Sequence, residues 1–289
     1  MATLLDIRRR VRSVKSTQQI TRAMKMVAAA RLRRAQERVV NARPYANQML
    51  ALLASVAART DPARRAHPLL AERPVKKVLV VLVTADRGLC GAFNANLIRT
   101  AQAHLRDLAR AAGEQPSLIV VGRKGRDYFR RRPVEIVAEH VNIFGRLEIS
   151  HAQAIAQQVI AFYTEQKVDA VEFIYNEFKS VLTQRLTVER YLPIKPLAPS
   201  EGQALIDYIY EQPAEEIFGV LLPRYVEIEV YRALVESQAA EFAARMTAME
   251  AATNNAAEMI DHLTLHMNRA RQAAITREII EVVSGAAAL

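Results

Sequence analysis

Glycine and proline are absent from two long stretches of this 289-residue chain, and that absence constrains the fold more than any other feature. The first stretch covers residues 1–43 and stops at Pro44, and the second covers residues 224–284, after the last proline. Both residue types weaken helices, because glycine is too free and proline lacks a backbone donor. We therefore predict a helix over residues 4–43, about 60 Å long, that ends or kinks at Pro44, and one of about 90 Å over residues 224–284.

Apolar residues in both stretches recur at alternating spacings of three and four, the heptad pattern of a left-handed coiled coil. The first seam is Leu4, Ile7, Val11, Val14, Gln18, Thr21, Lys25, Ala28, Leu32, Ala35, Val39 and Ala42. The second seam is Val235, Ala239, Phe242, Met246, Met249, Thr253, Ala256, Ile260, Leu263, Met267, Ala270 and Ala274. The polar members of the first seam fall together in its middle, so we expect the seam to shift there onto Ile20, Met24 and Val27.

Helices at the two ends of a chain, joined through one globular insertion, pair most simply as an antiparallel rod. We expect the globular domain at one end of this rod and both termini toward the other. The second helix is longer by about twenty residues, so its last ~30 Å should project alone, where Ile275, Ile279 and Val282 leave the seam. The expected domains are residues 1–60 and 214–289 for the helices and 74–200 for the insertion.

The insertion alternates strands with helices, which predicts a Rossmann-like α/β domain with a mostly parallel sheet. The apolar, β-branched run Val78–Thr84 is typical of a strand that is buried on both faces. The other expected elements are a helix at 92–112, a strand at Ser117–Val121, a helix that follows Gly122–Gly125 and reaches Arg132, a helix at 148–167, and strands at 168–175 and Val181–Arg190.

Motifs for chemistry are weak in this chain. The glycine turns at Gly88–Gly91 and Gly122–Gly125 match neither phosphate-binding pattern, so we expect no nucleotide site. The basic group between Arg123 and Arg132 favours a solvated helix face over an anion site. His262, His266 and Glu258 share a helix face, but without the metalloprotease spacing they are also better explained as solvated. We predict no catalytic residue, no metal and no cofactor.

Charge is concentrated at the N-terminus. Residues 1–43 hold twelve basic and two acidic residues, which accounts for the net charge of +10 of the whole chain. This helix should therefore meet an anionic partner. The single cysteine, Cys90, excludes an internal disulfide, and we expect it to be a small buried side chain. We also expect neither a secretory signal nor a membrane span.

Three segments together resemble the gamma subunit of F-type ATP synthases, the central stalk of the rotary enzyme, in its bacterial form without the regulatory insertion. The first is STQQITRAMKMVA at residues 16–28, and the third is RQAAITREIIEVVSGA at residues 271–286. Between them, TADRGLCG at residues 84–91 is similar to that family's TDRGLCG turn, except that Ala85 separates the threonine from the aspartate and so displaces the pattern by one residue. The resemblance runs from end to end.

The resemblance implies a rotor that transmits torque between a proton-driven membrane ring and a catalytic hexamer, for ATP synthesis or hydrolysis. The paired helices would enter the hexamer of alpha and beta subunits, and the α/β domain would hold the epsilon subunit and the ring of c subunits. The subunit would itself be non-catalytic. It would lie on the cytoplasmic face of the bacterial cell membrane, peripheral, touching the membrane only through its partners and binding no nucleic acid.

The same resemblance implies which residues act. Those expected to contact the beta subunit and couple the motion are Met24, Lys25, Arg271, Gln272, Thr276, Glu278 and Glu281. The turn motif of the central domain comprises Asp86, Arg87, Gly88 and Gly91. Lys25 departs from the pattern, because many relatives carry an acid or a neutral residue there. The alternative is a basic coiled coil that binds nucleic acid or acts as a scaffold, although residues 1–43 lack the aromatic residues that single-strand binders use.

Overall fold

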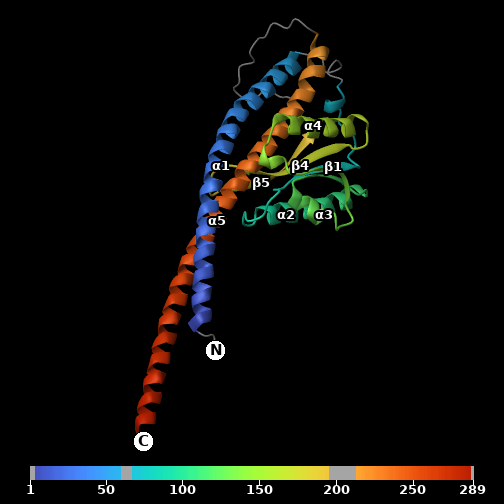
Figure 1. Ribbon diagram of the computed structural model, residues 1–289. Coiled ribbons are helices and arrows are strands. Elements are labelled where there is room, and N and C mark those ends of the chain that lie inside the picture. Colours follow the sequence, from blue (N-terminus) through green and yellow to red (C-terminus); the bar gives the residue numbers. More distant parts are fainter. Residues whose placement is uncertain (1–3, 60–66, 195–212, 288–289) are drawn as a thin grey trace. The chain divides into compact units, whose positions relative to one another are not determined.

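A computed structural model describes residues 4–59, 67–194 and 213–287 (Figure 1). The elements in chain order are α1 (Leu4–Arg59), η2 (Pro68–Leu70), β1 (Val78–Val83), α2 (Phe93–Ala112), β2 (Ser117–Val121), α3 (Arg123–Phe129), β3 (Glu135–His140), η3 (Ile143–Gly145), α4 (Ile149–Thr164), β4 (Ala170–Phe178), β5 (Gln184–Leu192) and α5 (Ala214–Ala287). The chain forms two compact units, one of residues 1–29 with 245–289 and one of residues 30–244. Both α1 and α5 continue from one unit into the other.

The α/β part of the second unit is a five-stranded sheet in the order β3-β2-β1-β4-β5. The pairs β1–β2, β1–β4 and β2–β3 are parallel, and only β4–β5 is antiparallel. Helices α2 and α3 lie on one side of the sheet and α4 lies on the other (Figure 1). All six residues of β1 are buried, as expected for a central strand with helices on both faces. The predicted mostly parallel, Rossmann-like sheet is therefore confirmed.

One strand was not predicted from the sequence. β3 pairs with β2 at the edge of the sheet, and none of its residues is fully buried. Its sequence, EIVAEH, carries Glu135 and Glu139 among only three apolar residues. An edge strand needs no continuous apolar run, so the signal that reveals β1 and β2 is missing here.

Of the two predicted alternatives, that α1 ends or kinks at Pro44, the first is wrong, because the helix continues through this proline to Arg59. A proline inside a helix costs about 3 kcal/mol. Beyond it, however, the helix buries Ala46, Leu53 and Val56 almost completely. A fully buried Leu or Val side chain contributes about 1.5–3 kcal/mol, so the apolar face outweighs the break. α5 similarly begins ahead of its internal proline, Pro223, and not after it.

In the first unit, the two helices pair antiparallel. The hydroxyls of Thr21 and Thr253 are 2.8 Å apart, and Lys25 Nζ is 2.6 Å from Glu250 Oε1. From Thr21 to Lys25 the residue number rises along α1, whereas the number of the contacted residue falls from Thr253 to Glu250 along α5. The antiparallel pairing that the sequence predicts is therefore confirmed.

The predicted shift of the seam in α1 is wrong. Ile20 and Val27 are 57% and 54% exposed, whereas Thr21 is 8% exposed. Two of the three polar residues stay in the seam because a partner is in place, Thr253 for Thr21 and Glu250 for Lys25. A satisfied polar pair at a seam position removes the need for the helix to rotate.

Candidate partner-contact sites

The last part of α5 is a single helix with almost no cover. Among the side chains from Arg271 to the end of α5 whose burial is described, Ala274 is half-buried and all the others are exposed. Ile275, Ile279 and Val282 are 48%, 57% and 72% exposed, although their spacing places them on one helix face. The prediction that this end projects beyond its partner helix is confirmed. We call residues 271–287 the tip.

The structure places five of the expected contact residues on this tip, all of them exposed. They are Arg271, Gln272, Thr276, Glu278 and Glu281. At helical spacing, Arg271 and Glu278 border one side of the apolar stripe formed by Ile275, Ile279 and Val282, and Gln272 and Thr276 border the other. Within the described parts of the chain, none of these five side chains makes a hydrogen bond or an ion pair. An apolar stripe between polar borders is suited to burial against another protein.

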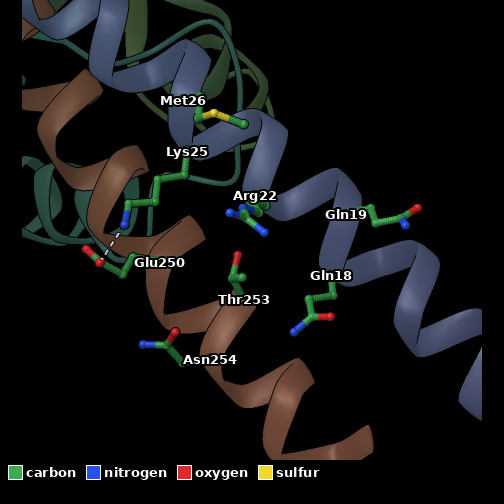
Figure 2. Close-up of a pocket in the computed structure, with 8 residues that line it drawn as sticks. All are labelled: Gln18, Gln19, Arg22, Lys25, Met26, Glu250, Thr253 and Asn254. Atoms are coloured by element: carbon green, nitrogen blue, oxygen red, sulfur yellow. Dashed lines mark hydrogen bonds and ion pairs between the residues drawn. The ribbon is translucent and has the colours of Figure 1, made fainter.

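The other two expected contact residues, Met24 and Lys25, are half-buried on α1. Lys25 lies in a groove of about 410 Å³ between the helices of the first unit. The residues that line it are Gln18, Gln19, Arg22, Lys25, Met26, Glu250, Thr253 and Asn254 (Figure 2). Figure 2 shows Gln18 and Arg22 directed toward α5, whereas Gln19 points away from it. Lys25 Nζ lies 2.6 Å from Glu250 Oε1, so the carboxylate of the same chain partly neutralises the lysine charge.

Asp86, in the turn motif after β1, fastens neighbouring loops. Its Oδ1 accepts hydrogen bonds from the backbone N–H of Arg123 at 3.1 Å and of Asn142 at 2.8 Å. Its Oδ2 accepts a bond of 3.4 Å from the N–H of Phe144. One carboxylate thus holds the start of α3 and the loop after β3. Arg87 and Gly91, by contrast, are exposed, and Gly91 has a positive φ of 56° that suits the turn.

Thr84 and two glycines complete this packing. Thr84 Oγ1 donates to the carbonyl of Val121 at 3.0 Å and accepts from the N–H of Gly125 at 2.9 Å. A Cβ on Gly122 would lie 2.1 Å from the carbonyl oxygen of Thr84, so no other residue fits there. Gly88 is less restricted, because its nearest neighbour to an added Cβ would be Lys124 Cε at 3.6 Å.

These bonds bear on the expectation that the turn at Gly122–Gly125 holds no phosphate, which stays a prediction. In nucleotide-binding α/β domains, free N–H groups at a helix start, near the carboxyl ends of the strands, hold the phosphates. Here the N–H groups of Arg123, Lys124 and Gly125 are taken by Asp86, by the carbonyl of Ala85 and by Thr84. The chain's own oxygens therefore occupy the donors that a phosphate would need.

The same edge of the sheet carries the helix pair of the second unit. Phe178 ends β4, and its N–H donates to Glu236 Oε2 of α5 at 2.9 Å. Its carbonyl accepts from Arg43 Nη2 of α1, also at 2.9 Å. In this strand order the crevice between β1 and β4 is the position where α/β proteins bind ligands. In this chain, α1 and α5 are held next to it.

Other candidate residues give no site. Cys90 is 1% exposed, so the prediction that it is buried is confirmed. His262, His266 and Glu258 are exposed. Over residues 4–59, 67–194 and 213–287, no group of three His, Cys, Asp or Glu is arranged to hold a metal ion. None of the helices in these ranges has the length and apolar character that a membrane span requires.

Sequence patterns missed a buried ionic cluster on β4. Glu172 is 6% exposed and contacts His104 Nε2 at 2.5 Å and Arg190 Nη2 at 2.9 Å. The hydrogen bond from His104 and the bonds from Arg190 lower the pKa of the Glu172 carboxyl, against the opposing effect of burial. The cluster links α2, β4 and β5, so its evident role is to hold the sheet together. The one sequence signal was an acidic residue within an apolar strand.

Comparison with known proteins agrees with this architecture. A family model described as ATP synthase matches residues 3–289. An ATP synthase gamma chain of Solibacter usitatus is 53% identical over 290 residues, covering 100% of this chain and 99% of the relative. One from Moorella thermoacetica is 54% identical over 289 residues, with both chains covered completely.

Solved structures point the same way. A chain in the central stalk and c-ring structure of the Tetrahymena thermophila mitochondrial ATP synthase is 30% identical, with a TM-score of 0.61, covering 81% of this chain and 99% of that one. A chain in the Euglena gracilis mitochondrial ATP synthase has 20% identity and a TM-score of 0.68, covering 99% and 94%, and so supports the fold alone.

The long paired helices around an α/β domain and the exposed helix tip define a stalk subunit of a larger assembly. The full-length matches are more specific: the chain belongs to the family of ATP synthase gamma chains. The comparisons support the rotor hypothesis over the alternative of a basic nucleic-acid-binding coiled coil or scaffold.

Proposed function

We propose that this chain is the rotating shaft that couples an ion-driven membrane ring to ATP synthesis or hydrolysis in an alpha–beta hexamer. The observation that carries the proposal is the tip. The tip carries an apolar stripe with polar borders, and no described part of the chain covers it. It belongs to a chain of the gamma family, in which such a surface fits contact with another subunit. An asymmetric shaft presents different contacts to each surrounding subunit, and such differential contacts bias each subunit between its open and closed states.

The proposed contacts with the beta subunit are Met24, Lys25, Arg271, Gln272, Thr276, Glu278 and Glu281. Arg271 can donate charge-assisted hydrogen bonds to carboxylates or carbonyls, and Gln272 can both donate and accept. On α1, the exposed residues Arg8, Arg9, Arg10 and Arg12 favour an acidic facing surface. The turn motif of Asp86, Arg87, Gly88 and Gly91 is assigned a structural role instead. In it, Asp86 holds the neighbouring loops and Gly91 adopts the positive φ of the turn.

We further propose that the subunit performs no bond chemistry itself. The filled N–H groups at the start of α3 support this, because they leave no cradle for phosphates. The α/β domain would carry the epsilon subunit and the ring of c subunits. The chain would then be peripheral, on the cytoplasmic face of the membrane, and would reach the membrane only through these partners.

Reconstitution tests the proposal directly. Alpha and beta subunits are mixed with or without this chain, and complex formation is followed by gel filtration together with ATP hydrolysis. We expect a complex that contains this chain and turns over ATP steadily, while the chain alone neither hydrolyses ATP nor binds it tightly in calorimetry. Failure to assemble, combined with salt-sensitive high-affinity binding to DNA at physiological ionic strength, would favour the nucleic-acid alternative.

A further inference from the structure

Within residues 30–244, the helix pair is fixed to the α/β domain by side chains that bind the domain's main chain. Arg43 and Glu236 bind the carbonyl and the N–H of Phe178, each at 2.9 Å. Arg43 Nε also donates to Glu236 Oε1 at 2.9 Å, so the two side chains hold each other and the same residue of the sheet. The acceptor Glu236 is only 3% exposed.

A second pair of bonds reaches the loop after β3. Gln238 Nε2 donates to the carbonyl of Phe144 at 3.0 Å, and Arg38 Nη1 donates to the carbonyl of Leu147 at 3.3 Å. Gln238 is 5% exposed and Leu147 is 3% exposed, so the bond from Gln238 is largely shielded from water, whereas Arg38 is an exposed residue. We call the bonds from Arg38, Arg43, Glu236 and Gln238 to Phe144, Leu147 and Phe178 the docking contact.

Asp86 supports the receiving side of the docking contact. It accepts the N–H of Phe144, whose carbonyl accepts from Gln238, and the N–H of Asn142 two residues earlier. The turn motif after β1 therefore positions the loop that receives the helices. This gives the motif a purpose that requires no ligand.

We propose that the docking contact is the element through which torque passes between the helix pair and the α/β domain, with Arg43 and Glu236 as its positioning residues. This proposal rests on the rotor function proposed above. The hydrophobic effect is non-directional, whereas hydrogen bonds depend steeply on angle. Bonds that come from two helices and end on one strand and one loop therefore fix the orientation of the domain on the helices.

The decisive experiment uses the complete membrane complex in vesicles and measures ATP hydrolysis and ATP-driven ion pumping in the same preparation. The test variants are Arg43→Lys and Glu236→Gln, alone and together. Lysine keeps the charge but loses the planar fork that spans two acceptors, and glutamine has one acceptor oxygen in place of two. The matched controls are Arg33→Lys and Glu37→Gln, an exposed pair on the same helix, 85% and 65% exposed.

We expect the double variant to lose pumping at least about two-fold more than hydrolysis, because part of the rotation is taken up by a loosened domain, while the controls keep the wild-type ratio. An unchanged ratio of pumping to hydrolysis in assembled double-variant complexes would overturn the proposal. If the wild-type chain itself fails to assemble or to pump, the rotor function fails instead, so the two failures are distinguishable.

A second measurement on the full-length chain covers the case in which the double variant does not assemble. The amide of Phe178 should be protected from hydrogen exchange in the wild type. In Glu236→Gln it should exchange about ten-fold faster than in the Glu37→Gln control, in keeping with one weakened hydrogen bond. Equal protection in the two variants would show that Glu236 does not hold the strand, and the proposal would be withdrawn.

Discussion

Residues 233–243 and residues 271–287 lie on one helix, α5, but differ in what covers them. Every residue from Ala233 to Ala243 is buried, including Glu236, Gln238 and Glu241. In the tip, Ile279, Val282 and Val283 are 57%, 72% and 62% exposed. Burial along this helix therefore follows the neighbours that the chain itself supplies and not the hydrophobicity of the residues. Apolar residues that the chain leaves uncovered indicate a surface completed by another subunit.

The two regions also use polar residues differently. Glu236 and Gln238 are buried, and both bind the main chain of the α/β domain. Gln272 and Thr276 are exposed, with no such bond inside the described chain. Substitutions in the buried segment should thus affect folding first, whereas substitutions in the tip should affect the assembled complex and leave folding alone. Glu236→Ala in the buried segment and the double substitution of Gln272 and Thr276 in the tip test this contrast directly.

The largest effect on stability is expected for Glu236→Ala. The substitution leaves Arg43 Nε and the N–H of Phe178 without their acceptor, while Arg43 Nη2 keeps the carbonyl of Phe178. Removing one partner of a buried charged pair costs about 3–5 kcal/mol, and because Arg43 is 43% exposed we expect about 3 kcal/mol. Urea unfolding of the full-length chain measures the loss. The control is Glu250→Ala, which breaks the exposed pair with Lys25 and should cost about 0–1 kcal/mol. Equal losses in the two variants would remove the contrast.

A smaller loss, of about 2 kcal/mol, is expected for Asp86→Ala. The N–H groups of Arg123, Asn142 and Phe144 lose an ionised acceptor, and a hydrogen bond to a charged group contributes about 1.5–3 kcal/mol. Water can reach part of this turn, which limits the cost. Thermal unfolding checks the prediction against Arg87→Ala, a neighbouring exposed residue that should be near neutral. A destabilised Arg87→Ala variant would mean that the turn acts through more than its carboxylate.

Glu172→Gln should have a still smaller effect at neutral pH, about 1 kcal/mol, since glutamine keeps the shape and one acceptor. The folded-state pKa of Glu172 lies below its ordinary value because of His104 and Arg190. Its stabilising effect is therefore complete above the unfolded-state pKa of about 4.3 and is lost as the pH falls through the lower folded-state value. Stability measured between pH 6 and pH 3 should fall less steeply in Glu172→Gln than in the wild type. Parallel curves would contradict the assignment.

The regular parts of the fold could be predicted from the sequence because they depend on local patterns. The apolar run of β1 and the three-and-four spacing of the seams each state which residues are buried. The polar seam residues and the edge strand β3 were misjudged or missed, because their satisfaction depends on partners far away in sequence. Thr21, for example, is paired with Thr253 across 232 positions.

The docking contact could not be predicted for a related reason. Its receiving groups are the backbone atoms of Phe144, Leu147 and Phe178, and every residue type carries the same backbone acceptor. Nothing in the identity of these residues marks them. The five tip residues were found through family resemblance, and the structure adds that all of them except Glu281 border an exposed apolar stripe. Their contact with a beta subunit stays a prediction.

The smallest effect on stability, and the sharpest test of the contrast, is expected for Gln272→Ala combined with Thr276→Ala. Exposed residues without intrachain partners normally change stability by less than about 0.5 kcal/mol, and alanine favours the helix. The circular dichroism and the unfolding midpoint of the isolated chain should therefore match the wild type. If these side chains bind a beta subunit, each lost hydrogen bond costs about 0.5–1.5 kcal/mol in the complex, which is enough to lower the ATPase rate. Thr264→Ala, at a half-buried position of α5 ahead of the tip, serves as the comparison. Unchanged assembly and unchanged turnover in the double variant would show that the tip only guides rotation, because its polar borders would then be as solvated in the complex as in the free chain.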